Sequence, residues 1–106
     1  MNRAVVDHVV PVQLPRLAGT RHAADHLIEP KLVEVAGATV RLLGQNMIDA
    51  SSSFSDQLLV RLVDASVGEV VVYSGPDDFF DYLTASAKDL GFKRLRRATP
   101  TEEYSV

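Results

Sequence analysis

The sequence predicts an α/β domain with a predominantly parallel or mixed sheet of about four to five strands and helices packed against it. The first indication is that β-branched runs alternate with segments of helical length and helical apolar spacing. The second is the run EVVVY at residues 69–73, which is apolar without alternation, as is typical of a strand covered on both faces. The third is the length of 106 residues, which predicts one domain over residues 1–106.

Composition narrows the class of protein. Hydrophobic residues make up 46% of the chain and charged residues 24%, which is enough apolar material for one core. The formal net charge of -3 argues against a protein that coats nucleic acid or an anionic membrane. Absence of cysteine excludes disulfides, thiolate zinc sites and cysteine nucleophiles. The amino-terminal residues do not have the pattern of a signal peptide, and no apolar run is long enough to span a bilayer, so we expect a cytoplasmic protein without a cofactor.

The first third of the chain predicts a strand and a short helix. The strand should end near Pro11, because proline cannot donate to a sheet ladder. Thr20 is placed to cap a helix that Pro30 stops. The β-branched residues of the strand are Val5, Val6, Val9, Val10 and Val12, and the apolar residues of the helix are Ala23, Ala24, Leu27 and Ile28. Residues 32–43 then predict either two strands joined at Gly37 or one strand with a bulge.

Residues 49–65 change from a polar turn to an amphipathic helix. Ser53 and Asp56 have the spacing of a capping box, so the helix is expected to begin near Ser53. Its predicted apolar face consists of Phe54, Leu58, Leu59, Leu62 and Val63, and its predicted polar face of Ser55, Asp56, Arg61 and Asp64.

The last third of the chain predicts a strand, a helix and a final strand. EVVVY forms the first strand, and the turn at residues 74–78 leads into a helix that Gly91 ends in a left-handed conformation. The inner face of that helix is expected to consist of Phe79, Phe80, Leu83, Ala87 and Leu90. Residues 92–97 form the final strand, and residues 101–106 are expected to be a frayed tail.

The stretch from Val40 to Leu62, VRLLGQNMIDASSSFSDQLLVRL, resembles the STAS domains of bacterial anti-sigma factor antagonists. Their pattern is an apolar strand, a glycine, an apolar pair, and then Asp-Ser-Ser-Gly-Leu opening a helix. The stretch is more similar still to the STAS-like family of unknown function, in which a Ser-Ser-Phe run followed by an acidic pair opens that helix. The order of the remaining elements extends the similarity over most of the chain.

The resemblance implies roles for individual residues. Gly44 matches the family glycine, Met47 and Ile48 the apolar pair, and Asp49 the acid before the serines. Ser51 falls where the antagonists carry the serine that their partner kinase phosphorylates. The chain departs from the family pattern at Arg41, Ala50, Ser53 and Gln57.

A non-enzymatic regulatory module that binds another protein is therefore expected, with Ser51 as the candidate phosphoacceptor. By the same resemblance, the partner is a histidine-kinase-like ATPase or an anti-sigma factor. The candidate contact residues are Asn46, Asp49, Ser51, Ser52, Ser53, Ser55 and Asp56. Two alternatives stay open: a self-associating domain, such as a homodimer, whose serines only cap a helix, and a nucleic-acid contact through the basic strand 93–97.

Enzymatic and metal sites have weaker support. No serine has the G-x-S-x-G pattern of a hydrolase, so no catalytic residue is assigned. His22 and His26 are spaced to share a metal with Glu29, but HAADH lacks the glutamate of the H-E-x-x-H pattern. No metal site is therefore expected.

Overall fold

Four strands form the main sheet in the order β1-β3-β5-β6, and every neighbouring pair is parallel. The computed structural model describes residues 8–104. Its elements are β1 (Val9–Gln13), β2 (Leu17–Ala18), α1 (Arg21–Ile28), the 3-10 turn η2 (Glu29–Lys31), β3 (Thr39–Leu43), β4 (Asp49–Ala50), α2 (Ser52–Asp64), β5 (Glu69–Tyr73), α3 (Asp77–Leu90), β6 (Leu95–Arg97) and α4 (Pro100–Tyr104). A second, two-stranded parallel sheet pairs β2 with β4. The predicted α/β class is confirmed.

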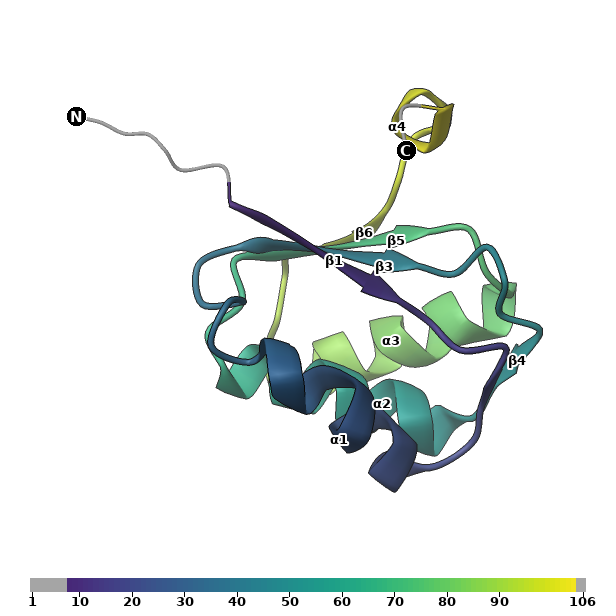
Figure 1. The fold of residues 1–106 in the computed structure, drawn as a ribbon, viewed down its shortest axis with the longest axis horizontal. Helices are drawn as coiled ribbons and strands as arrows, with labels where there is room; N and C mark the ends of the chain where they lie inside the picture. Colours follow the sequence, from purple (N-terminus) through teal and green to yellow (C-terminus); the bar gives the residue numbers. More distant parts are fainter. Residues whose placement is uncertain (1–7, 105–106) are drawn as a thin grey trace.

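Helices α1, α2 and α3 cover one face of the main sheet, while α4 stands on the opposite side (Figure 1). Each of the first three helices connects one main-sheet strand to its neighbour, always in the same direction across the sheet. Because such crossovers are right-handed, three steps in one direction place all three helices on the same face. We call this the helical face and the other the far face. None of the described helices is long and apolar enough to cross a membrane.

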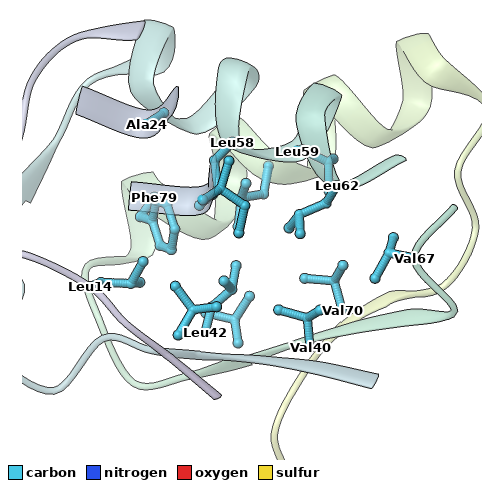
Figure 2. Packing of buried hydrophobic residues seen from close by; sticks show 14 of the residues in the cluster. Leu14, Ala24, Val40, Leu42, Leu58, Leu59, Leu62, Val67, Val70 and Phe79 are labelled. Atoms are coloured by element: carbon cyan, nitrogen blue, oxygen red, sulfur yellow. The ribbon is translucent and has the colours of Figure 1, made fainter. Parts of the chain in front are cut away.

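The core lies between the helical face and α2. Two rows of side chains run across β1, β3 and β5, because residues in register point to the same side of a parallel sheet. These rows are Val10, Val40 and Val70, and Val12, Leu42 and Val72. Leu58, Leu59 and Leu62, which the sequence assigned to the apolar face of α2, are fully buried above them (Figure 2). Phe54, assigned to the same face, is also fully buried.

The apolar side chains of β5 on the far face are buried, although the described helix on that side, α4, is short (Figure 1). Val71 lies in register with Arg41 on one side and Arg96 on the other. The guanidinium of Arg41 also lies 5.6 Å from the ring centroid of Tyr73. Long arginine side chains can cover apolar surface with their methylene groups and keep their charge in water. The predicted burial of EVVVY on both faces is thus confirmed. On the far face its side chains lie beside those of arginines.

Strand β1 passes through Pro11, although the sequence predicted that the strand would end there. A proline is tolerated at this point because β1 is an edge strand, so its missing N–H removes no sheet bond on the open side. Val5 and Val6, which were also assigned to this strand, lie outside the described residues.

Residues 32–43 match neither predicted alternative. Only Thr39–Leu43 is a strand, and the preceding residues form turns with one isolated antiparallel bridge between Ala36 and Val67. Gly37, with φ of 69°, marks a turn before the strand where the prediction placed a junction between two strands.

The predicted helix ends are largely correct. The hydroxyl of Thr20 accepts the Ala23 amide at 3.0 Å and caps α1, and Gly91 ends α3 with φ of 70°. Pro30 lies inside η2, two residues after the last residue of α1. Leu90, assigned to the inner face of α3, is 38% exposed because it occupies the last turn, beyond the covering helix and sheet.

The tail at residues 101–106, which the sequence predicted to be frayed, contains most of α4 (Pro100–Tyr104), and residues 105–106 lie outside the described residues. The Glu102 amide donates to Thr99 Oγ1 and the Thr99 amide donates to Glu102 Oε1, which is a reciprocal capping box. The two terminal guanidinium nitrogens of Arg96 donate to the Glu102 carboxylate, at 2.7 and 2.9 Å. These bonds to Arg96 and Thr99 lower the pKa of Glu102 to about 2. No residue of α4 is buried, so polar bonds hold this helix.

We predict that Gly68→Ala destabilises the fold by about 1 to 3 kcal/mol, as overpacking of a tight site does. A Cβ at position 68 would lie 2.8 Å from the carbonyl oxygen of Gly37 and 2.9 Å from that of Ala38, so backbone must move. Urea unfolding measures the loss. Gly19→Ala is the control, because a Cβ there has nothing within 4 Å. Equal stability of the two variants would contradict the close approach of these segments.

Candidate functional site

Residues 44–56, which we call the serine turn, begin at a fixed point next to the loop that follows β5. The amide of Gly44 donates to the carbonyl of Tyr73 at 2.8 Å. A Cβ on Gly44 would lie 3.2 Å from Gly75 Cα, closer than side chains normally pack, so glycine suits this position. The backbone bond to Tyr73 and the close approach to Gly75 therefore fix the position of the chain where it leaves β3.

The apolar pair Met47 and Ile48 splits at this turn. Met47 is buried, and its amide donates to the carbonyl of Gly44. Ile48 points outward and is 58% exposed. One member of the pair thus anchors the turn, and the other is available at the surface.

Strand β4 continues the turn and pairs with β2, an element the sequence did not predict. Leu17 lies in register with Asp49, and Ala18 with Ala50. Both alanines are buried, whereas Leu17 is 70% exposed. A two-residue strand has no periodicity to detect, so the sequence gave no signal for Leu17 as a surface residue beside the serines.

Ser51 is the amino-terminal cap of α2. Its hydroxyl oxygen accepts the amide of Phe54 at 3.0 Å, and its O–H donates to the carbonyl of Gly19 at 2.9 Å. The predicted capping box of Ser53 and Asp56 is wrong, because α2 already begins at Ser52. The cap lies at Ser51 because pairing of β4 with β2 brings this residue, and not Ser53, beside Gly19.

The other three serines of the turn differ in exposure. Ser52 is exposed and Ser53 is half-buried. Ser55, which was predicted on the polar face and as a contact residue, is fully buried, and its hydroxyl donates to the carbonyl of Ser51 at 2.8 Å. It is small enough to sit inside with its polar atom satisfied by the preceding turn of its own helix. Ser55 is therefore not available to a partner.

Asp56 joins three helices instead of capping one. Its Oδ1 accepts the Ser86 hydroxyl of α3 at 2.7 Å, and its Oδ2 accepts Arg21 of α1 at 2.8 Å. The hydrogen bond from Ser86, followed by that from Arg21, lowers the pKa of Asp56 below its ordinary value of 3.8. Since Ser86 is buried, this carboxylate also satisfies a hydroxyl that would otherwise lack a partner.

Gln57 and Arg61 extend the polar link between α1 and α2. The Gln57 amide donates to Asp25 Oδ1 at 2.8 Å and its carbonyl oxygen accepts from Arg21. Arg61 pairs with Asp25 and with Glu29. A glutamate at position 57 would place a second carboxylate against Asp25, which explains why glutamine fits here.

The residues considered for metal binding do not form a site in the part of the chain that is described. The rings of His22 and His26 stack with centroids 6.3 Å apart, but the Glu29 carboxylate is bonded to Arg61 at 2.8 Å. Within residues 8–104 no group of three histidine, aspartate or glutamate side chains is placed to hold an ion. Neither bond of the Ser51 hydroxyl involves a histidine.

Part of the basic strand is engaged in ion pairs within the fold. Arg96 pairs with Glu69 and Glu102. Arg97 pairs with Asp77 and lies 4.6 Å from the ring centroid of Phe80. The cations that suggested nucleic-acid contact are Lys93, Arg94, Arg96 and Arg97. Two of these four therefore have acidic partners within the fold.

Comparison of the chain with protein-family models, curated proteins and solved structures found no match.

We predict that Asp56→Asn lowers stability at neutral pH and flattens its acid dependence. Because the folded pKa of Asp56 is lowered, its contribution is full above the unfolded value of 3.8 and is lost as pH falls through the folded pKa. Thermal unfolding between pH 7 and pH 2 measures this. The two proteins should converge at the acid end.

Asp64→Asn is the matched control, since Asp64 is exposed on the same helix and makes no ion pair with any described residue. If its pH profile changes as much as that of Asp56→Asn, the link between the three helices contributes no specific stability.

Proposed function

We propose that this chain is a cytoplasmic, non-enzymatic regulatory module of STAS-like fold that binds another protein at the amino end of α2. We call the contact region the serine surface, and it comprises Leu17, Asn46, Ile48, Asp49, Ser51, Ser52, Ser53 and the exposed edge of Asp56. The observation that carries the proposal is the exposure of Leu17 and Ile48 beside the serine turn.

Leu17 and Ile48 belong to paired backbone segments, since the Ile48 amide donates to the carbonyl of Arg16 at 2.8 Å. Two large apolar side chains held on adjacent segments offer a partner the kind of anchor that carries binding energy. Around them lie hydroxyl, amide and carboxylate groups, as at the polar rim of a protein interface.

Regulation by phosphorylation has a physical route at Ser51. A phosphate would replace the O–H that donates to Gly19 with oxygens that carry about -1.5 to -2 charges and only accept. The Gly19 carbonyl would then face like polarity, which opposes the contact between the segments 17–20 and 49–51. The same phosphate would be favoured by the positive end of the α2 dipole, so the helix itself tolerates it.

The resemblance to anti-sigma factor antagonists supports a histidine-kinase-like ATPase or an anti-sigma factor as the partner. This is an analogy at the level of the motif and the fold class. Self-association through the same surface is the rival from another class, and the capping bond of Ser51 is compatible with it. Mass measurement of the purified chain, alone and with its co-purified partner, distinguishes the two.

We predict that Leu17→Ser with Ile48→Ser lowers partner affinity about a hundredfold, as loss of two interface anchors does. Stability should stay within about 0.5 kcal/mol, because both side chains are exposed. Calorimetric titration with the purified partner measures the affinity. Val33→Ser is the control, since Val33 is 95% exposed but precedes β3, at the other end of the sheet. An equal loss in the control would contradict the serine surface.

We predict that Ser51→Asp and Phe54→Ala act on different properties. Aspartate still accepts the Phe54 amide as a cap but cannot donate to Gly19, so affinity for the partner should fall about tenfold while the melting temperature stays nearly unchanged. Phe54 is fully buried, and its truncation should cost about 3 to 5 kcal/mol of stability.

Ser51→Ala separates the two bonds of the hydroxyl, because it removes the cap as well and should lower stability by about 1 kcal/mol. Unchanged binding by Ser51→Asp together with a lowered melting temperature of Ser51→Ala would leave Ser51 as a structural cap alone.

A further inference from the structure

A cavity of about 400 Å³ lies at the carboxyl ends of β3 and β5, beside α4. Its lining consists of Gln45, Ser74, Pro100, Glu103 and Tyr104. In open parallel sheets, ligands bind at the carboxyl ends of the strands. The volume falls within the range of about 300 to 1,000 Å³ that small organic ligands occupy. Helix α4 stands on the far face (Figure 1), and its residues Pro100, Glu103 and Tyr104 form part of the lining.

The polar lining of this cavity carries one carboxylate without a cation. The Ser74 hydroxyl donates to Glu103 Oε1 at 2.5 Å. Within residues 8–104 no ion pair involves Glu103, whereas its neighbour Glu102 is paired with Arg96 and the nearby Asp77 with Arg97. Glu103 is exposed, so its carboxylate is accessible to a cationic ligand.

Ser74 is held in a position that serves this arrangement. Its φ of 61° is left-handed, which is uncommon for a residue other than glycine. Its hydroxyl meets the carboxylate of Glu103 on α4.

Tyr104 adds an aromatic ring to the same lining. It is 95% exposed, so its ring is accessible to a ligand. A carboxylate next to an aromatic ring is a combination suited to an organic ammonium group, because the ring face attracts cations and the carboxylate accepts N–H bonds. The side-chain oxygens of Gln45 and Ser74 supply further acceptors.

We propose that this cavity binds a small organic cation, with the ammonium group on Glu103 and Ser74 and the apolar body against Tyr104 and Pro100. The proposal is independent of the serine surface, since its test requires no protein partner. An anionic ligand does not suit the cavity, because it would meet the unpaired charge of Glu103 directly.

The test compares 2-phenylethylammonium with 2-phenylethanol, which has nearly the same shape without the charge. Both are titrated into the full chain, and the backbone amides of Gln45, Ser74, Glu103 and Tyr104 are followed by heteronuclear NMR. We expect these amides to shift, and the ammonium compound to bind about tenfold more tightly than the alcohol. Equal affinities, or shifts confined to other parts of the chain, would overturn the proposal.

Two variants localise the interaction. Glu103→Gln keeps an oxygen for Ser74 but removes the charge, so the affinity for the ammonium compound should fall to about that for the alcohol. Tyr104→Ala should weaken ammonium binding about two- to fivefold. Asp89→Asn is the matched control, since Asp89 is an exposed acid of α3 outside the cavity and its loss changes the net charge equally. An unchanged affinity in Glu103→Gln, or an equal loss in Asp89→Asn, would refute the assignment.

Discussion

The handedness of the strand crossovers is the constraint from which the rest of this architecture follows. β1, β3, β5 and β6 are added to the sheet in chain order and in one direction, so right-handed connections bring α1, α2 and α3 to one face. That face can bury a continuous apolar surface against α2. Within residues 8–104, the far face has no long helix. Val71 and Tyr73 are buried there beside arginine side chains, and hydrogen bonds and ion pairs hold α4 in place.

Central placement of α2 links the core to the candidate site. Its buried face fixes the helix over the sheet, while its polar residues Asp56, Gln57 and Arg61 join it to α1, and Asp56 also to α3. The amino end of α2 is fixed by the bonds of Ser51 to Phe54 and Gly19. A change at Ser51 therefore acts on the contact between two surface segments, and the buried packing of Phe54 can remain as it is.

Local sequence signals were reliable where one short-range interaction decides the structure. Thr20 and Gly91 terminate helices as predicted, because a cap and a left-handed residue depend only on neighbours in the chain. The same signals failed where they competed. Ser53 and Asp56 have the spacing of a capping box, yet Ser51 caps α2, because pairing of β4 with β2 brings Ser51 beside Gly19.

The sequence by itself determined the α/β class, the strand at residues 69–73 and the apolar face of α2, because periodicity and β-branched runs specify which side chains must be buried. Only the tertiary structure decided that Leu17 lies beside the serine turn, that Ser55 is buried, and that Glu103 meets Ser74. Each of these depends on contacts between residues far apart in the chain, and a two-residue strand or a single polar bond leaves no periodic pattern from which it could be predicted.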